Sequence, residues 1–182
     1  MMNVKADNSW SLFLDRDGVI NERNFDGYIT SIDEFKFLEQ VKEGLKELSK
    51  YFKYIFVITN QQGVGKGEMT VTQLDEIHAY MLAELKKEGI HIDKVYFAAN
   101  LREAEEDRRK PNPAMGKEAQ LEFPELDFEK SIMVGDTDSD IHFGKNLGMK
   151  TVLIHSKEKV SASPDLIVNN LMELAHALEK WK

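Results

Sequence analysis

Short apolar segments, most of them followed at once by a polar residue, recur along this chain of 182 residues. They occupy Ser11–Leu14, Tyr54–Ile58, Val95–Ala99, Ile132–Val134, Thr151–Ile154 and Leu166–Val168. Continuous apolar runs of this length are typical of strands that are buried on both faces of a parallel sheet. The chain is therefore expected to fold around such a sheet.

Apolar residues at spacings of three and four fill the intervals between these segments. The stripes run from Leu38 to Phe52, Leu74 to Leu85, Ile141 to Leu147 and Leu171 to Trp181. Thr70 and Gln73 are placed as a capping box for the second stripe, and Gly89 and Gly148 as stops for the second and third. Alternation of strand and helix predicts a three-layer α/β sandwich with a mostly parallel sheet. No interval could hold a large cap domain, so we expect one domain over residues 1–182.

The composition limits the kinds of metal site and binding partner that the protein is expected to have. The chain has no cysteine, which excludes disulfides and thiolate metal ligands. Its formal net charge is −8, whereas proteins that bind nucleic acid usually present a basic face. No apolar run approaches the roughly 20 residues that span a bilayer, and no secretory signal is visible. We expect a cytoplasmic monomer without nucleic-acid or membrane partners.

Polar residues follow the predicted strands at the end where ligands bind in parallel α/β folds. They are Asp15 and Asp17, Thr59 and Asn60, Asp136 and Asp140, and Lys110 after the loop that follows the third segment. Two long loops accompany them, and long loops in compact domains are often functional. The first, Val19–Phe37, is a candidate flap over the site, and the second is Asn100–Pro113.

The string Asp15-Arg16-Asp17-Gly18 carries the chemistry. Residues two apart in extended chain point to one side, so both carboxylates can face one ligand. A divalent cation would relieve their repulsion and bind a phosphoryl oxygen. Asp15 could then attack phosphorus, while Asp17 exchanges a proton with the leaving group and with water. The alternative is an Asx-turn that closes the strand.

The other motifs are weaker alone. Residues 59–67 form a glycine-rich segment that could bind an oxyanion but do not match a P-loop. Arg109 and Lys110 could offset charge on a phosphoryl group, although a solvated charge run explains the preceding residues better. Asp136 and Asp140 suit a magnesium site, and the segment fails the EF-hand pattern. Asp138 and Ser139 are expected to face solvent or to cap a helix.

Together these strings resemble the four ordered motifs of the haloacid dehalogenase-like phosphatases. The motifs are Asp15-Arg16-Asp17-Gly18, Thr59-Asn60, Lys110-Pro111 and Gly135-Asp136 with Asp140. The resemblance covers nearly the whole chain and implies a Rossmannoid fold, Mg²⁺ and an aspartyl-phosphate intermediate. The fuller strings resemble the subfamily of D-glycero-D-manno-heptose 1,7-bisphosphate 7-phosphatase and histidinol phosphatase. The flap element Gly27-Tyr28 and the ending Gly63-Val64-Gly65-Lys66-Gly67 favour the heptose enzyme.

The resemblance also implies roles for single residues. Asp15 would be the nucleophile and Asp17 the acid and base, with Thr59 and Lys110 also catalytic. Mg²⁺ would be held by Asp15, Asp17 and Asp136, with Asp140 just outside this set. The substrate, a small phosphorylated metabolite, would be bound by Asp26, Gly27, Tyr28, Asn60, Gln61, Gln62, Arg109 and Lys110.

One departure from the subfamily leaves alternatives open. Such proteins usually carry a zinc-binding loop of Cys and His before Arg-Lys-Pro, but residues 98–109 here contain neither, so no zinc is expected. Thr137 also replaces a Lys that is common after the metal-binding Asp. The substrate that the resemblance implies is heptose 1,7-bisphosphate, which would lose its 7-phosphate. A polynucleotide 3′-phosphatase, a histidinol-phosphate phosphatase and a metal- or phosphate-responsive binding module without turnover are the alternatives.

Overall fold

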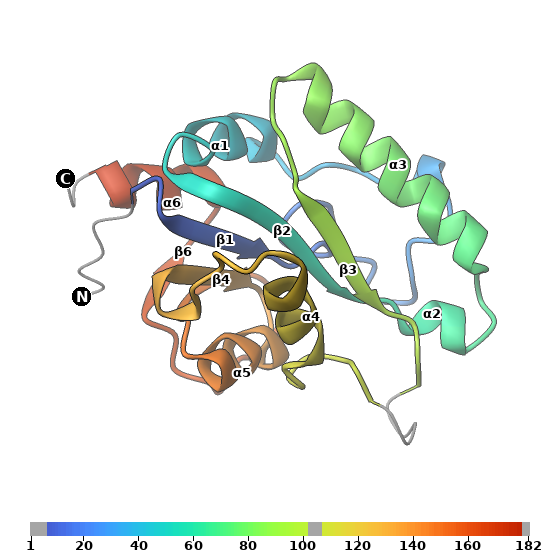
Figure 1. The fold of residues 1–182 in the computed structure, drawn as a ribbon. Helices are drawn as coiled ribbons and strands as arrows, with labels where there is room; N and C mark the ends of the chain where they lie inside the picture. Colours follow the sequence, from blue (N-terminus) through green and yellow to red (C-terminus); the bar gives the residue numbers. More distant parts are fainter. Residues whose placement is uncertain (1–6, 102–106, 180–182) are drawn as a thin grey trace.

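Six strands lie side by side in one sheet, and every pairing between them is parallel (Figure 1). Their order is β3-β2-β1-β4-β5-β6, with bounds β1 Trp10–Leu14, β2 Phe52–Asn60, β3 Lys94–Ala98, β4 Ser131–Gly135, β5 Lys150–Ile154 and β6 Leu166–Val168. The structure, a computed structural model, describes residues 7–101 and 107–179. It confirms the predicted α/β fold, with a fully parallel sheet where a mostly parallel one was expected.

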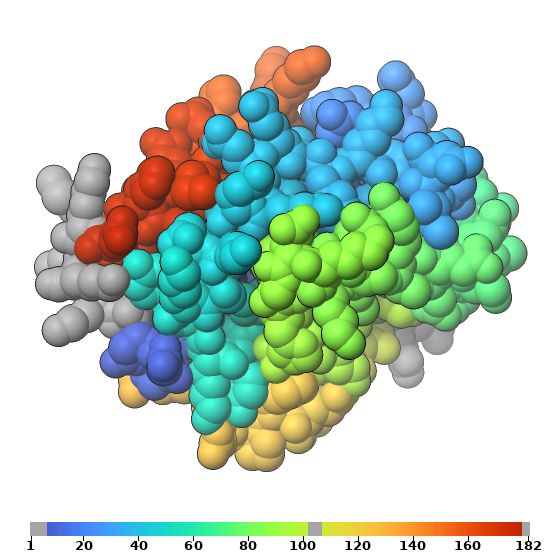
Figure 2. Space-filling view, turned by 90° about the horizontal axis from the view of Figure 1, so that it is seen from above, coloured from blue at the N-terminus to red at the C-terminus, as the bar shows by residue number. Residues whose placement is uncertain are grey.

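Helices cover both faces of the sheet and complete three layers. One face carries α1 Val41–Leu48, α3 Val71–Lys87 and α6 Leu171–Glu179, which Figure 2 shows beside one another, and the opposite face carries α4 Ala114–Glu122 and α5 Asp138–Leu147. Leu12 and Leu14 of β1 belong to the first core, and Phe13 between them belongs to the second. Burial on both faces is why the strands appear as continuous apolar runs. Within the described residues, no helix combines the length and apolarity needed to cross a membrane.

Local sequence signals set most helix ends. The Thr70 hydroxyl accepts a hydrogen bond from the Gln73 backbone amide, and the Gln73 side chain accepts one from the Thr70 amide. Helix α3 starts at this capping box, as predicted. Gly148 ends α5 in a left-handed conformation with φ +80°. The stripe expected from Leu38 to Phe52 is longer than α1, because left-handed Gln40 precedes the helix and Phe52 already opens β2. Trp181 lies outside the described residues.

Two α-helices of the described residues were not predicted. The short helix α2, Gln62–Gly65, occupies the glycine-rich segment after β2, and its four residues are too few to show a periodicity. Helix α4 buries only Met115, Gly116 and Ala119, so its apolar stripe is weak in the sequence. Helix α2 directly follows the carboxyl end of β2, whereas α4 lies in the connection from β3 to β4 and packs on a face of the sheet (Figure 1).

The long loop after β1 is held against the rest of the protein at several points. Asn21 makes single β-bridges to Asp17 and to Phe37, and Ile20 and Ile29 are buried in the core. A 3₁₀ turn, Ile32–Glu34, lies between Ile29 and Phe37 and is exposed. The stretch around residues 22–28 is also largely exposed.

Helices α1 and α6 approach closely at Gly44. A Cβ built there would lie 2.7 Å from the Met172 amide nitrogen and 2.8 Å from the Leu171 carbonyl carbon. Alanine should gain about 1 kcal/mol in helix propensity over glycine, but overpacking against backbone costs about 1–3 kcal/mol. We therefore expect Gly44→Ala to lower the free energy of unfolding, measured by urea denaturation. Glu43→Ala, an exposed neighbour in the same helix, is the control, and a stabilised Gly44→Ala would contradict the close packing.

Candidate active site

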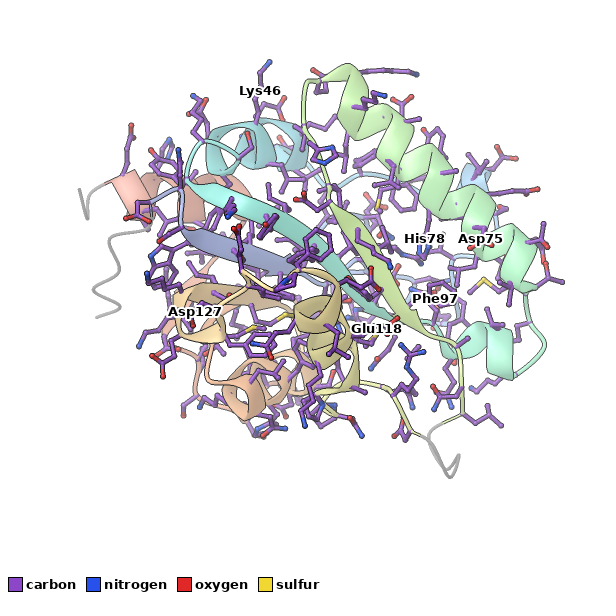
Figure 3. The ribbon with its side chains drawn as sticks, viewed as in Figure 1. Lys46, Asp75, His78, Phe97, Glu118 and Asp127 are labelled. Atoms are coloured by element: carbon purple, nitrogen blue, oxygen red, sulfur yellow. The ribbon has the colours of Figure 1, made fainter. Side chains whose placement is uncertain are left out.

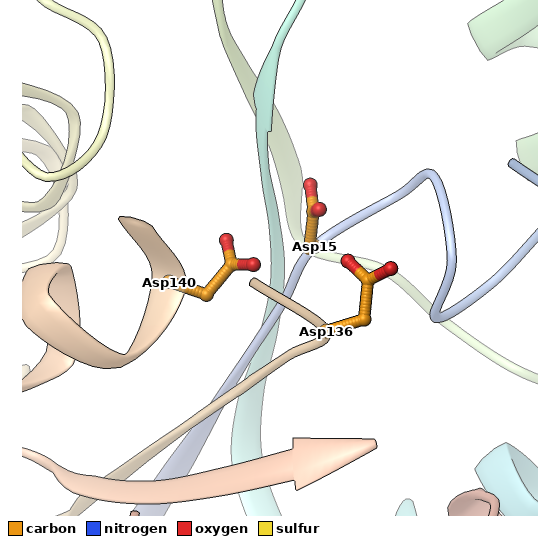
Figure 4. Close-up of side chains that lie close together, drawn as sticks. All are labelled: Asp15, Asp136 and Asp140. Atoms are coloured by element: carbon orange, nitrogen blue, oxygen red, sulfur yellow. The ribbon is translucent and has the colours of Figure 1, made fainter. Parts of the chain in front are cut away.

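Three buried carboxylates converge at the carboxyl edge of the sheet (Figure 4). Asp15 follows β1, Asp136 follows β4, and Asp140 lies in the first turn of α5. One oxygen of each lies within 4.8 Å of the others. The Asp15 amide donates to the Val134 carbonyl at 2.9 Å, so the pairing of β1 with β4 continues up to the cluster. The topology therefore brings together residues that are far apart in the sequence.

Gly18 makes room for this cluster. Its φ is +94°, and a Cβ at this position would lie 2.2 Å from Asp136 Oδ2. Any other residue would be strained and would push the Asp136 carboxylate away. Gly18 therefore allows both the turn after β1 and the position of Asp136 at the end of β4.

Lys110 is the buried counter-ion of the cluster. Its Nζ lies 2.8 Å from Asp15 Oδ1, 2.6 Å from Asp140 Oδ1 and 2.7 Å from the Ile58 carbonyl oxygen. The ammonium group donates to the Ile58 carbonyl and forms ion pairs with both carboxylates. Burial lowers the pKa of Lys110, but the charges of Asp140 and Asp15 outweigh it and raise the pKa overall. Lys110 is therefore held as a cation.

Asn60 positions Lys110 through the main chain. The Asn60 side-chain amide donates to the Lys110 carbonyl at 3.1 Å, and its oxygen accepts from the Lys110 amide at 2.9 Å. The amide at the end of β2 was expected to bind substrate. In the structure it still lines the cavity, but both ends of its side chain are engaged by the backbone of residue 110.

Arg23, from the loop after β1, is a second cation at the cluster. Its Nε and Nη2 donate to the two oxygens of Asp136 at 3.0 and 2.5 Å. The same Nη2 donates to the Asp17 carbonyl oxygen at 2.9 Å and lies 3.6 Å from Asp15 Oδ2. Sequence reasoning missed this residue, and its only signal was its place in an unusually long loop after the Asp15 motif.

Two of the carboxylates are hard to ionise in this arrangement. Burial raises the pKa of Asp15 to about 6, with Asp140 and Asp17 adding to the effect while Lys110 and Arg23 oppose it. Burial likewise raises the pKa of Asp136 to about 7, against the charge of Arg23. The cluster has more negative charge than its two cations offset.

The Asp17 carboxylate lies outside the group of three that converge and has its own polar partners. Both of its oxygens lie 3.0 Å from Arg16 Nη2, and they also accept from Asn21 at 2.9 Å and Gln61 at 2.8 Å. Burial would raise the pKa of Asp17, but Arg16 and these hydrogen bonds lower it. The expected metal set was Asp15, Asp17 and Asp136, with Asp140 outside. The three carboxylates that converge are Asp15, Asp136 and Asp140. The Asp17 carbonyl oxygen lies 2.9 Å from the Arg23 Nη2 that also contacts Asp136 and Asp15.

A buried chain of polar groups supports Asp17. Arg16 is fully buried, and its Nη1 lies 3.2 Å from Nε2 of His78 in α3. Figure 3 shows His78 next to Phe97 of β3, with ring centroids 5.8 Å apart. Burial and the charge of Arg16 lower the pKa of His78 to about 3, so the ring is neutral. His78 occupies the apolar stripe of α3, between Ile77 and Met81, which was a signal in the sequence.

A cavity of about 430 Å³ opens beside the cluster. Of the expected catalytic and substrate residues, it is lined by Asp15, Asp17, Tyr28, Asn60, Gln62, Arg109 and Lys110. Gln61 is buried against Thr59 and Asp17, and Asp26 and Gly27 are exposed outside this cavity. Thr59 itself is fully buried and accepts from Gln61 at 2.8 Å.

The far wall of the cavity was not predicted. It is formed by Thr137, Asp138, Ser139, Glu158 and Lys159. The Asp138 carboxylate accepts from the amides of Ser161 and Ala162 at 2.8 and 2.7 Å, and from the Ser161 hydroxyl at 2.9 Å. Asp138 therefore ties the loop after β5 to the start of α5, which differs from the expected capping or solvent-facing role. The cap of α5 is Thr137, paired with Asp140.

Comparisons with known proteins agree with this geometry. A family model described as HAD-hydrolase-like matches residues 107–174. The chain is 37% identical to D-glycero-alpha-D-manno-heptose-1,7-bisphosphate 7-phosphatase of Burkholderia mallei, over 88% of each chain. It is 31% identical to D-glycero-beta-D-manno-heptose-1,7-bisphosphate 7-phosphatase of Escherichia coli, over 93% of this chain and 94% of the relative.

A solved structure has the same fold. It is D,D-heptose 1,7-bisphosphate phosphatase from B. bronchiseptica in complex with magnesium and phosphate, with a TM-score of 0.85. The match covers 95% of this chain and 99% of that one, at 22% sequence identity. The likeness shows a shared Rossmannoid fold without a large cap.

Removing the buried cation should be costly and pH-dependent. Lys110→Met leaves Asp15 and Asp140 without their counter-ion, and breaking a buried ion pair costs about 3–5 kcal/mol. Losing the cation raises the pKa of Asp15 further above its unfolded value, because Lys110 is the main group that lowers it. Stability is then kept while Asp15 is protonated and lost as pH rises through its folded pKa. We expect the loss of unfolding free energy relative to wild type to be larger at pH 8 than at pH 5.

Urea denaturation at the two pH values measures this difference. Lys53→Met removes an exposed lysine that pairs with Glu125 far from the site, and should change stability little at either pH. An equal loss for both variants would show that Lys110 is not the counter-ion of the cluster.

Proposed function

We propose that this chain removes the 7-phosphate of heptose 1,7-bisphosphate through an aspartyl-phosphate on Asp15. The chain belongs to the D-glycero-D-manno-heptose-1,7-bisphosphate 7-phosphatase family of HAD-like phosphatases. The observation that carries this proposal is the buried Asp15–Asp136–Asp140 cluster with its lysine, open to a cavity that is lined by further cations. The anomer is left open, because relatives of both anomeric types are similar to the chain.

The residues present fit a magnesium ion. The donor set consists of oxygen atoms alone, which Mg²⁺ prefers, and the cluster holds more negative charge than Lys110 and Arg23 offset. We assign Asp15, Asp136 and the carbonyl oxygen of Asp17 as ligands. Asp140 fits less well, because its oxygens already interact with Lys110 at 2.6 Å and accept from Thr137 at 2.6 and 3.0 Å. Bound there, the ion would supply charge stabilisation to a phosphoryl oxygen.

Asp15 is suited to nucleophilic attack. Its Oδ1 accepts from the Arg16 amide at 2.8 Å and lies 2.8 Å from Lys110 Nζ, so the carboxylate has a fixed orientation toward the cavity. In the first step an Asp15 oxygen bonds to phosphorus and the bond to the sugar oxygen breaks. In the second step water attacks the same phosphorus and releases Asp15 and inorganic phosphate. Lys110 offsets the charge that develops on the phosphoryl group.

Asp17 would move the protons of both steps. Its lowered pKa keeps it ionised in the arrangement observed, which suits removal of a proton from the attacking water. Donation to the leaving sugar oxygen requires a higher pKa, and an approaching phosphate supplies the like charge that raises it. The Arg16–His78 pair holds Asp17 at the edge of the cavity during both steps.

The substrate assignment rests on the relatives and on the cations of the cavity. Arg109 and Lys159 line it and could bind the distal phosphate, and Tyr28 could cover the sugar. The net charge of −8 speaks against the polynucleotide 3′-phosphatase alternative. Histidinol phosphate carries no second phosphate for these cations. The monomeric state, the single domain over residues 1–182 and the cytoplasmic location stay predictions.

A phosphate-release assay tests this function. We expect Mg²⁺-dependent hydrolysis of heptose 1,7-bisphosphate, with much slower reaction of histidinol phosphate and 3′-phosphorylated oligonucleotides. Asp15→Asn should lower kcat by several orders of magnitude, because it removes the nucleophile, while keeping the fold by circular dichroism. Efficient hydrolysis of the oligonucleotide alone would favour the alternative, and an Asp15→Asn variant with a tenth of wild-type kcat would remove Asp15 from its role. No turnover of any phosphorylated metabolite would favour a binding module.

Metal binding should depend on pH. Protons compete with Mg²⁺ for Asp15 and Asp136, whose pKa values are raised to about 6 and about 7. We therefore expect the rise in melting temperature on adding Mg²⁺ to EDTA-treated protein to be small at pH 5 and larger at pH 8. A pH-independent rise would place the ion elsewhere. Protein purified without added metal should contain no stoichiometric zinc, since the chain lacks cysteine.

A further inference from the structure

One nitrogen of Arg23 occupies the point where the oxygens of three residues converge. Its Nη2 lies 2.5 Å from Asp136 Oδ1, 2.9 Å from the Asp17 carbonyl oxygen and 3.6 Å from Asp15 Oδ2. These are the oxygens that the proposed function assigns to Mg²⁺. The Arg23 side chain reaches these oxygens from the loop after β1, and 23% of its side-chain surface is exposed.

We propose that Arg23 is a built-in substitute for the metal ion, which holds the site together in the metal-free protein and leaves when a divalent cation binds. The inference rests on the proposed function, because it takes the metal position from it. It assigns to Arg23 a direct competition with Mg²⁺ for Asp136 and for the Asp17 carbonyl.

Charge balance supports this exchange. When ionised, the three carboxylates exceed Lys110 and Arg23 by one negative charge. A divalent cation added beside Arg23 would leave the buried cluster one charge positive, whereas its entry with release of Arg23 leaves the cluster neutral. Buried charge is tolerated only when it is paired, so the exchange is favoured over joint occupancy.

Distance leads to the same conclusion. Mg²⁺ binds oxygen at about 2.0–2.1 Å and demands nearly octahedral geometry. Arg23 Nη2 lies 2.5 Å from Asp136 Oδ1 and 2.9 Å from the Asp17 carbonyl oxygen, in the space between the oxygens that the ion would bind. The two cations therefore cannot occupy this position together in the arrangement observed.

A second partner for Arg23 is already close. Its Nη1 lies 3.9 Å from Glu158 Oε1, and both side chains line the cavity. A released guanidinium can therefore turn toward Glu158 without crossing the packed core. The flanking side chains of Glu22 and Asn24 are exposed, while the backbone of Glu22 is held by a hydrogen bond from its amide to the Lys36 carbonyl at 2.8 Å, so the exchange needs a turn of the Arg23 side chain alone.

Calorimetric titration of the metal-free protein with Mg²⁺ at pH 8 tests the competition. Arg23→Gln should lower the Kd for Mg²⁺ by about five-fold or more, the lower range of typical coupling between two sites. The same variant should melt at a lower temperature than wild type in EDTA, because it loses the counter-ion, and should gain more than wild type from Mg²⁺. Lys42→Gln, which removes one positive charge at an ion pair with Glu84 away from the site, should leave Kd unchanged.

Further outcomes decide the inference. An unchanged or higher Kd in Arg23→Gln, with wild type binding Mg²⁺ normally, would overturn the exchange and leave the proposed function standing. Wild-type protein that binds no Mg²⁺ would overturn both. If Arg23→Gln fails to fold, Arg23→Lys replaces it: one ammonium cannot donate to both Asp136 oxygens as the guanidinium fork does, so a smaller drop in Kd is expected. In wild type, the Arg23 Nε–Hε NMR signal should shift as Mg²⁺ is added, and a fixed signal at saturation would contradict release.

Discussion

The ammonium group of Lys110 is the interaction on which the rest of the site depends. It joins Asp15 after β1, Asp140 in α5 and the carbonyl of Ile58 in β2, and thereby links three elements at the carboxyl edge of the sheet. Several acidic groups can be buried together only if cations accompany them. The backbone of Lys110 is fixed in turn by Asn60, so the end of β2 determines where the cation lies.

The sheet supplies the frame for this arrangement. Because β1 lies between β2 and β4, the residues that follow these three strands meet at one place without long reaching loops. Two separate cores, one on each face, hold the strands in register, while the site lies at their common edge. The chemistry is thus placed by backbone topology, and its electrostatics are set by the few side chains that close over it.

The sequence predicted the parts of the structure that repeat. Six apolar segments indicated six strands, and the polar residues that follow them indicated the site, because buried parallel strands and their ends leave a regular pattern. The direction of the Asp17 carboxylate was not predictable, since it follows from the buried Arg16–His78 pair, which no periodicity reports. Arg23 was missed for a similar reason: its reach to Asp136 depends on how an irregular loop folds. Helix α4 buries too few apolar side chains to stand out.

The anchoring of the loop after β5 has a consequence for how such a protein can diversify. The loop carries Glu158 and Lys159 into the cavity, yet its hydrogen bonds to the start of α5 run through one carboxylate, that of Asp138. None of the phosphoryl-transfer residues belongs to this loop. Sequence change can therefore accumulate in it, and alter which molecules are admitted, while the reacting end of the pocket stays as it is. The part of the cavity that selects the molecule and the part that reacts with it are therefore held by different segments of the chain.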